Sequence, residues 1–180
     1  IVHDSFQRQL GKSAGASELE SWKHSLRQMD SVLEDAEIPS NAGVAIEFNI
    51  PQTGKRVDFI ITGTRQDRQR TAVIVELKQW QEAKATLMDG IVSTFVGGRE
   101  REVNHPSYQA WSYAMLIEDF NETVRLDPIH LQPCAYLHNH PRNGEIDHPH
   151  YREHIARAPL FLARERAKLQ AFIRDHVRHG

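Results

Sequence analysis

The central part of the fold can be inferred from two short stretches, Val57-Asp58-Phe59-Ile60-Ile61 and Val73-Ile74-Val75-Glu76-Leu77-Lys78. Both are rich in β-branched residues and are short enough for strands, so we expect two buried β-strands. Each stretch also carries charge where apolar side chains should lie. A buried carboxylate is unfavourable unless it is paired or binds a metal. A structural or functional role must therefore explain the charged residues Asp58, Glu76 and Lys78 in buried strands.

The spacing of these charges predicts a shared site. Glu76 and Lys78 are two residues apart in a strand, so their side chains share a face about 6–7 Å apart. Asp58 lies on the preceding strand and, in hairpin register, brings a second carboxylate to the same point. Glu47, on an expected strand over 44–50, is a candidate for the same site. These oxygen ligands suit Mg²⁺ or Mn²⁺, and Lys78 would orient a water or stabilise charge on phosphorus.

The strand over 44–50 has alternating character. Ile46, Phe48 and Ile50 are expected on one face, and Glu47 is expected on the other.

Composition fits one globular domain and excludes several classes of protein. The chain has 180 residues, 39% of them hydrophobic, and a formal net charge of −2, which does not indicate a polyanionic partner by itself. Divalent cations can still bridge carboxylates to phosphate. The single cysteine, Cys134, rules out an internal disulfide and is expected in the core; a reducing, cytoplasmic location follows as an expectation. No apolar run approaches the roughly 18 residues of a membrane span, so we expect no membrane partner.

The hydrophobic pattern predicts the order α-β-β-β-α-β-α, an α/β fold with a mixed central sheet flanked by helices. Residues 1–16 should form a short polar helix and a loop. A helix should begin at Ser17, whose side chain can form a capping box with Glu20. The glycine-containing segment 82–102 and the polar segment 138–154 are expected to be irregular. The remaining elements are predicted as strands over 44–50, 57–62, 71–79 and 132–137 and helices from 105 and over 163–177.

The helix that begins near His105 carries a second motif. Gln109 and Tyr113 are four residues apart, so they share a helix face. His105 is expected to start the helix, not to act as a general base. Gln-x-x-x-Tyr alone is ordinary helix surface. After an Asp…Glu-x-Lys sheet, we expect Gln109 to bind a phosphate or the scissile strand, and Tyr113 to do the same or to pack.

Together these motifs resemble the PD-(D/E)xK nuclease superfamily, and Gln109-Ala-Trp-Ser-Tyr113 resembles the QxxxY motif of its RecB-like branch. Val57 stands where many members have proline, and the upstream histidine of RecB-like members has no clear counterpart. The resemblance spans about 17–137. It places the core signature of the superfamily on Glu47, Asp58, Glu76 and Lys78.

This resemblance implies a restriction-endonuclease-like αβββαβ core and a Mg²⁺- or Mn²⁺-dependent deoxyribonuclease. Asp58, Glu76 and the Leu77 carbonyl would bind the metal, and Glu47 would assist with this metal or a second one. Residues 1–180 would form one nuclease-like domain, with a core at about 17–137 and a C-terminal loop and helix over 138–180. DNA, single- or double-stranded, is the implied partner. Many members dimerise to cut both strands, so a homodimer remains open.

A narrower likeness concerns three segments: Glu76-Leu-Lys-Gln-Trp80, His105-Pro-Ser-Tyr-Gln-Ala-Trp-Ser-Tyr113 and Pro133-Cys-Ala-Tyr-Leu-His138. They look like the nuclease-like N-terminal region of a bacterial family in which a P-loop helicase-like ATPase domain follows. By this likeness the chain would be part of a longer nuclease–helicase protein. A role in DNA processing or in defence against foreign DNA is implied.

Other signals are interpreted as structural. Gly11-Lys12-Ser13 lacks the earlier glycine of a P-loop, because Phe6 stands there. The histidines of segment 138–154 are expected to make a loop polar, with an incidental zinc site as the minor alternative; they are His138, His140, His148, His150 and His154. His138-Asn139-His140 is not interpreted as an HNH nuclease motif, because turn residues follow it. Five basic residues are candidates for phosphate contacts but are more often solvated surface charges: Arg65, Arg70, Lys84, Arg99 and Arg101.

Two alternatives compete with the nuclease. The first is a nucleic-acid-binding or regulatory module that keeps the fold without activity. The second is a protein-interaction domain in which Asp58, Glu76 and Lys78 form only a folding network. The network predicts a loss of several kcal/mol when one partner of a buried pair is removed. A metal site predicts no loss in metal-free buffer, because removing one of two crowded carboxylates relieves their repulsion.

Overall fold

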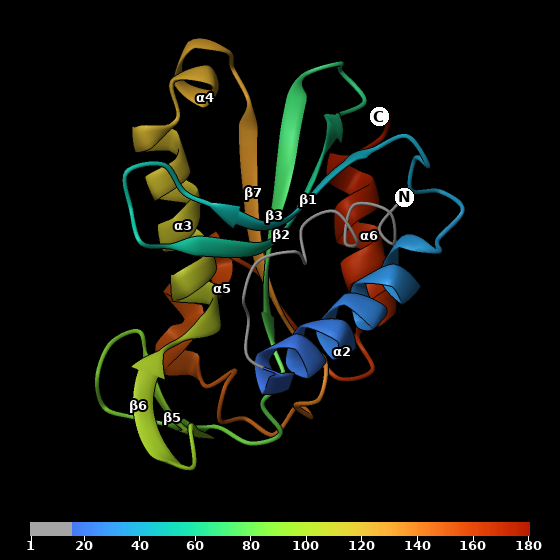
Figure 1. Cartoon of the computed structure of the whole chain (residues 1–180). Helices are drawn as coiled ribbons and strands as arrows, with labels where there is room; N and C mark the ends of the chain where they lie inside the picture. Colours follow the sequence, from blue (N-terminus) through green and yellow to red (C-terminus); the bar gives the residue numbers. More distant parts are fainter. Residues whose placement is uncertain (1–15) are drawn as a thin grey trace.

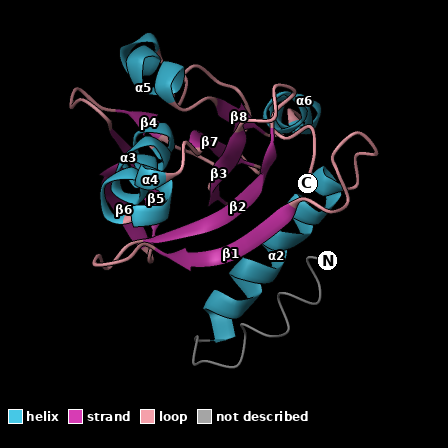
Figure 2. Cartoon of the chain, turned by 90° about the horizontal axis from the view of Figure 1, so that it is seen from above, coloured by secondary structure: helices cyan, strands magenta, loops and turns pink. Residues whose placement is uncertain are grey.

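The chain folds around a five-stranded mixed sheet with helices on both faces (Figures 1 and 2). The computed structural model describes residues 16–180. The strand order is β1-β2-β3-β7-β8. The α/β class and the mixed sheet predicted from the sequence are confirmed. The helix and loop expected over 1–16, together with Gly11-Lys12-Ser13, lie outside the described residues.

Strand β3 (Arg70–Lys78) is the centre of the sheet. It pairs antiparallel with β2 (Arg56–Thr64), which pairs antiparallel with β1 (Gly43–Asn49). On its other side β3 runs parallel to β7 (His130–Leu137), and β7 runs parallel to β8 (Leu160–Leu162). Residues 71–76 of β3 are all buried, as its unbroken apolar run predicts.

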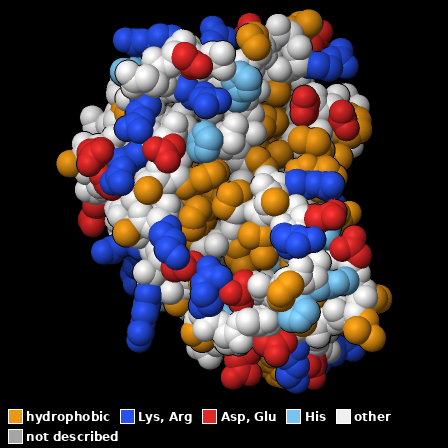
Figure 3. Space-filling model, turned by 180° about the vertical axis from the view of Figure 1, so that it is seen from behind, with side chains coloured by type: hydrophobic (Ala, Val, Ile, Leu, Met, Phe, Trp, Pro, Cys, Tyr) orange, Lys and Arg blue, Asp and Glu red, His pale blue; other side chains and the backbone are white. Residues whose placement is uncertain are grey.

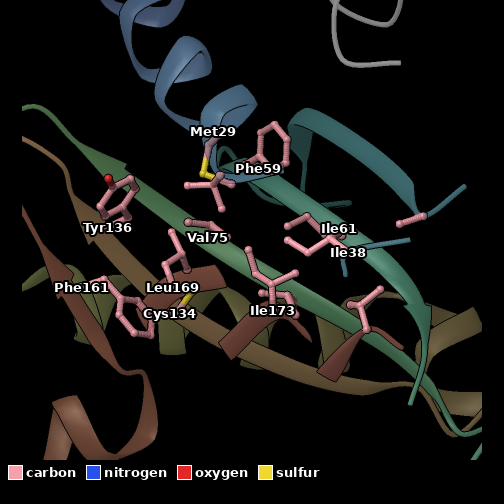
Figure 4. Close-up of a cluster of buried hydrophobic side chains, with 14 of the residues drawn as sticks. Met29, Ile38, Phe59, Ile61, Val75, Cys134, Tyr136, Phe161, Leu169 and Ile173 are labelled. Atoms are coloured by element: carbon pink, nitrogen blue, oxygen red, sulfur yellow. The ribbon is translucent and has the colours of Figure 1, made fainter. Parts of the chain in front are cut away.

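Helices α2 (Ala16–Leu33) and α6 (Arg166–His176) cover one face of the sheet. Their apolar side chains pack against inward residues of the central strands, as Figure 4 shows for Met29, Leu169 and Val75. Helix α2 begins one residue before the predicted Ser17. None of the helices within residues 16–180 is long and apolar enough to cross a membrane.

Helix α3 (Pro106–Phe120) covers the opposite face and links β6 toward β7. Its buried Ala114 and Ile117 pack against Ile60 and Ile74 of the sheet. The helix start predicted at residue 105 is confirmed. A short helix α4 (Glu122–Leu126) follows α3, and the connection from β7 to β8 contains a 3₁₀ turn η1 (Pro149–Tyr151) and helix α5 (Arg152–Arg157).

Segment 82–102 is not irregular, and the prediction for it was wrong. It contributes to a second sheet of three antiparallel strands, β4 (Lys84–Ala85), β5 (Ile91–Val96) and β6 (Arg99–Asn104). Gly97 and Gly98 form a two-residue hairpin turn with φ angles of +60° and +79°. Tight hairpins need positive φ at both central residues, which glycine adopts without strain. The glycines therefore mark a turn between strands.

The histidine-rich segment also differs from its prediction as a polar loop. His138, His140 and His154 are buried, with exposed fractions of 8%, 0% and 7%. His154 hydrogen-bonds Asp89, and His148 accepts a hydrogen bond from the backbone N–H of His150 at the start of η1. Within residues 16–180 no group of three or more His, Cys, Asp or Glu side chains is arranged to hold a metal ion.

The sheet extends beyond the 17–137 stretch that the motifs span. Strand β8 adds Leu160, Phe161 and Leu162 to its edge, and α6 buries Leu169 and Ile173 against its face. The C-terminal residues also return to the sheet: the N–H of Thr64 at the end of β2 donates to the carbonyl of His179 over 2.8 Å. The last forty residues are therefore integral to the packing.

A substitution in α6 tests whether this helix is integral. Leu169→Ala should lower the unfolding free energy by about 2–5 kcal/mol, because it leaves a cavity beneath a side chain with no exposed surface. The exposed neighbour Arg166→Ala is the matched control and should change the value by less than about 0.5 kcal/mol. Urea unfolding followed by circular dichroism measures both. Equal values for the two variants would mean that α6 is peripheral.

Candidate functional site

The register of the central hairpin brings two carboxylates together. The β2–β3 ladder pairs Phe59 with Val75, so its next step sets Asp58 opposite Glu76. Asp58 Oδ2 accepts a hydrogen bond of 2.8 Å from the backbone N–H of Leu77. The arrangement expected from the sequence, with two carboxylates from neighbouring strands at one point, is the one observed.

Lys78 and Gln109 converge on one oxygen of Glu76. Lys78 Nζ donates to Glu76 Oε1 over 2.7 Å, and Gln109 Nε2 donates to the same atom over 2.7 Å. Gln109 Nε2 also lies 3.0 Å from the hydroxyl of Tyr113. This link is possible because Glu76 and Lys78 point from the sheet face that α3 covers. The predicted helix motif and the predicted strand motif therefore meet in one network.

The two oxygens of Glu76 differ in their hydrogen bonding: Oε1 accepts two hydrogen bonds, and Oε2 accepts none from the described residues. Glu76 is 2% exposed, and its Oε2 is buried with no hydrogen-bond partner among the described residues. An unsatisfied buried polar atom is unfavourable by about 1–3 kcal/mol, and by more when it is charged. Asp58 lies opposite Glu76, but its carboxylate cannot donate a hydrogen bond when it is ionised. A shared proton or a cation would satisfy both carboxylates.

The electrostatics of the pair follow from burial and mutual repulsion. Burial, followed by the charge of Asp58, raises the pKa of Glu76 to about 8. Burial also raises the pKa of Asp58, although Lys78 opposes this change. Burial disfavours the charge of Lys78, but Glu76 and Asp58 outweigh it and raise the lysine pKa. Without a cation, the site therefore contains a cationic lysine and retains a proton on Glu76 at neutral pH.

These carboxylates lie at a cleft of about 340 Å³. Asp58 and Lys78 form part of its lining, whereas Glu76 lies behind them. Helix α2, strand β1 and strand β5 contribute the other walls. The full lining consists of Ser25, Leu26, Glu47, Asp58, Leu77, Lys78, Gln79, Trp80 and Val96.

Glu47 reaches this cleft because the β1–β2 pairing is distorted. Ile46 and its partner Phe59 pack in the core under α2, whereas Phe48 and its partner Val57 pack on the α3 side. The alternation of faces therefore shifts by one residue at Glu47, which has φ of +54°. The prediction that Ile46, Phe48 and Ile50 share a face was wrong for this reason.

The carboxylate of Glu47 is held by an ion pair with Arg56 of β2. Glu47 therefore lines the cleft, as expected, but it does not complete a three-carboxylate cluster with Asp58 and Glu76. Mg²⁺ is commonly bound in proteins by only one or two carboxylates together with waters and substrate phosphates. The orphan oxygen of Glu76 and the neighbouring carboxylate of Asp58 fit that pattern, and the Leu77 backbone adjoins them.

The structure adds side chains that the sequence did not indicate. Gln79 Nε2 donates to Ser25 Oγ over 2.9 Å, and Ser25 Oγ lies 3.4 Å from His138 Nε2. These contacts join α2 to the ends of β3 and β7 and form one wall of the cleft. They connect residues 54 and 113 positions apart, so no local pattern could reveal them. Trp80 lies beneath Lys78, with Nζ 5.5 Å from the ring centroid.

Two residues interpreted as structural are confirmed as such. His105 is fully buried, and its Nδ1 accepts the backbone N–H of Ser107 at the start of α3. Burial lowers the pKa of His105 to about 4, so the ring is neutral. Cys134 is fully buried in the core, and burial raises the pKa of its thiol. A buried neutral thiol is inert.

Comparisons of the chain with models of protein families, with curated proteins and with solved structures find no match.

The raised pKa of Glu76 predicts an unusual pH dependence of stability. Its pKa is about 8 in the folded chain and about 4.5 when unfolded, so the folded state binds more protons between these values. The unfolding free energy in EDTA should therefore fall as pH rises from about 5 to about 8. Mg²⁺ should restore stability at pH 8 by taking the place of the proton.

Thermal unfolding at pH 5 to 9, with EDTA or Mg²⁺, checks this expectation. Asp58→Asn should flatten the pH dependence in EDTA and be as stable as the parent or more so at pH 8, because it removes the crowding charge. The exposed Glu102→Gln is the matched control and should behave like the parent. Loss of 3–5 kcal/mol in Asp58→Asn would favour a purely structural charge network.

Proposed function

We propose that this chain is a metal-dependent nuclease of the PD-(D/E)xK type that hydrolyses DNA phosphodiester bonds with Mg²⁺ or Mn²⁺. One observation carries the proposal. A buried glutamate with an oxygen that has no partner among the described residues lies beside a second carboxylate, Asp58, and both Asp58 and Lys78 line a cleft. A charge arrangement this unfavourable in a central strand is explained when a cation and a phosphate complete it.

The order of elements supports the same proposal. Helix α2, the meander β1-β2-β3, helix α3 and the parallel strand β7 follow one another as αβββαβ, the order of a restriction-endonuclease-like core. Strands β4 to β6 are an insertion between β3 and α3. The carboxylates lie toward the end of β3, where the sheet opens into the cleft.

Each residue has a role in the proposed hydrolysis. Asp58 and Glu76, with the Leu77 carbonyl, would hold the metal. When bound, the metal supplies charge neutralisation of the phosphate and a more acidic water. In hydrolysis the water oxygen bonds to phosphorus and the water releases a proton, while the P–O ester bond breaks and the leaving oxygen takes up a proton. Lys78 Nζ would move from Glu76 to the phosphate and stabilise the charge that develops there.

Gln109 and Tyr113 would act on the same step from α3. The Gln109 amide donates to Glu76 Oε1 and thereby helps to orient this carboxylate. The proposed contact of Gln109 or Tyr113 with a phosphate requires the amide to exchange this partner when substrate enters. Glu47 would assist the metal after exchange of its Arg56 partner, or would position Arg56 beside the substrate.

A catalytically silent nucleic-acid-binding module is the second candidate. It is favoured by one observation: Glu76 lies behind the cleft lining, and its Oε1 already accepts from both Lys78 and Gln109. Such a closed network would hold the fold without chemistry. The two candidates differ in whether metal-dependent cleavage occurs.

The sequence resemblance places the proposed nuclease in a wider context. A P-loop ATPase domain in the same protein would move or unwind the DNA that this site cuts. Cleavage in DNA processing or in defence against foreign DNA would suit that combination, as would a homodimer that cuts both strands.

Cleavage assays test the proposal. The chain should cut single- or double-stranded DNA with Mg²⁺ or Mn²⁺ and not in EDTA. Lys78→Ala should reduce the rate by about 100-fold or more, in the range found on removing one transition-state donor. Asp58→Asn should abolish metal-dependent cutting. Lys168→Ala, on an exposed lysine of α6 paired with Glu165, is the matched control and should cut at the parent rate.

Labelled DNA and RNA of equal sequence, resolved on gels, give the rates and the preferred polymer. Cutting that persists in Asp58→Asn would point to a contaminant. No cutting by the parent on any substrate, with Mn²⁺ shown to bind, would favour the silent module.

A further inference from the structure

The hairpin formed by β5 and β6 reaches from the body of the protein to the rim of the cleft. Its base is anchored by Val92, which is fully buried, and by Thr94, whose Oγ1 donates to the carbonyl of Glu82 over 2.6 Å. Its tip, residues 95–102, is exposed except for Val96, which lines the cleft. Figure 1 shows the hairpin projecting at the opposite end of α3 from α4.

Register determines which hairpin side chains face the cleft. Arg99 lies directly opposite Val96, and Arg101 lies opposite Thr94. Directly opposed residues in an antiparallel pair share a face. Both arginines therefore lie on the hairpin face that carries the cleft-lining Val96. Phe95 and Glu100 occupy the other face.

The two arginines differ from the neighbouring Lys84 in their ion pairing within residues 16–180. Lys84 is paired with Glu100 over 3.0 Å. Within residues 16–180, neither Arg99 nor Arg101 forms an ion pair. The Arg101 guanidinium lies against Gly97, where a Cβ atom would come within 3.2 Å of Nη2. The glycine turn thus leaves room for a guanidinium at the tip.

No acidic side chain among residues 16–180 balances the charge of Arg99 or Arg101 through an ion pair. The chain has a net charge of −2, and on the face in Figure 3 basic and acidic side chains are intermingled around an apolar strip. Arg99 and Arg101 lie two residues apart on β6 and have no carboxylate partner among residues 16–180. Beside a cleft that contains carboxylates, they form a local cationic site. A guanidinium binds phosphate oxygens through paired N–H donors.

Resting on the proposed nuclease function, we infer that Arg99 and Arg101 bind the phosphate backbone of a polynucleotide strand beside the cleft. The hairpin acts as a positioning arm: its arginines hold phosphates next to the one that reaches Asp58 and Lys78. Because the contacts are to phosphates, they add affinity without sequence preference. They also make binding dependent on salt.

The test measures binding separately from hydrolysis. All variants carry Asp58→Asn and are kept in EDTA, so neither cutting nor metal binding enters. A fluorescein-labelled oligo(dT) strand is titrated by anisotropy at several salt concentrations. Arg99→Ala with Arg101→Ala should raise Kd at least tenfold. It should also make the slope of log K against log salt shallower by about 1.4, since each phosphate contact on a single strand contributes roughly 0.7.

The control pair is Arg68→Ala with Arg125→Ala, which removes the same charge from the other end of the molecule. Both residues are exposed, and the Arg70–Asp127 ion pair shows that the β2–β3 turn and α4 lie together there. The control should leave Kd within about twofold. Arg99→Lys with Arg101→Lys should keep the parent salt slope, because lysine retains the charge.

Three results would overturn the inference. Equal losses in the hairpin and control pairs would mean that only net charge matters. If the hairpin pair loses no DNA-binding affinity while the parent chain still cleaves DNA, the hairpin does not bind phosphate and the nuclease proposal is unaffected. Absence of both binding and cleavage in the parent would remove both proposals. A parallel titration with labelled oligo(U) shows whether the same residues bind RNA.

Discussion

The burial of Glu76 beside Asp58 is the constraint on which the site depends. Glu76 lies in the central strand of the sheet and is 2% exposed, so its charge cannot be solvated by water. Lys78 and Gln109 both donate to one oxygen, and the other oxygen is buried with no hydrogen-bond partner among the described residues. Helix α3 packs over the same face of the sheet, and this position lets Gln109 hydrogen-bond Glu76 in the strand. A site of this kind stores repulsion that a cation can relieve.

The parts of the site that the sequence predicts are those set by local geometry. Residues two apart in a strand share a face, and residues four apart in a helix share a face. The sequence therefore predicts that Glu76 lies beside Lys78, and that Gln109 lies beside Tyr113. Hairpin connectivity then brought Asp58 opposite Glu76. These relations depend only on backbone periodicity, which short motifs determine well.

The parts that could not be predicted depend on long-range packing or on departures from periodicity. Glu47 sits where the alternation of β1 shifts by a residue, and a regular strand would have given Phe48 and Ile46 the same face. Segment 82–102 contains alternating residues around a Gly-Gly turn, a hairpin signal that was interpreted as irregular structure. His138 and His140 are buried because segments distant in sequence, including α2 and β8, pack around them, which no local pattern reveals.

Binding of a divalent cation by Asp58 and Glu76 is the step on which the proposed chemistry depends. The most direct measurement is the electron paramagnetic resonance signal of free Mn²⁺ during titration into the parent chain, Asp58→Asn and Glu102→Gln at pH 8. The parent and Glu102→Gln should remove Mn²⁺ from solution at a stoichiometry near one. Asp58→Asn should bind at least tenfold more weakly. Equal binding by all three proteins, or none by the parent, would contradict this role of Asp58 and Glu76.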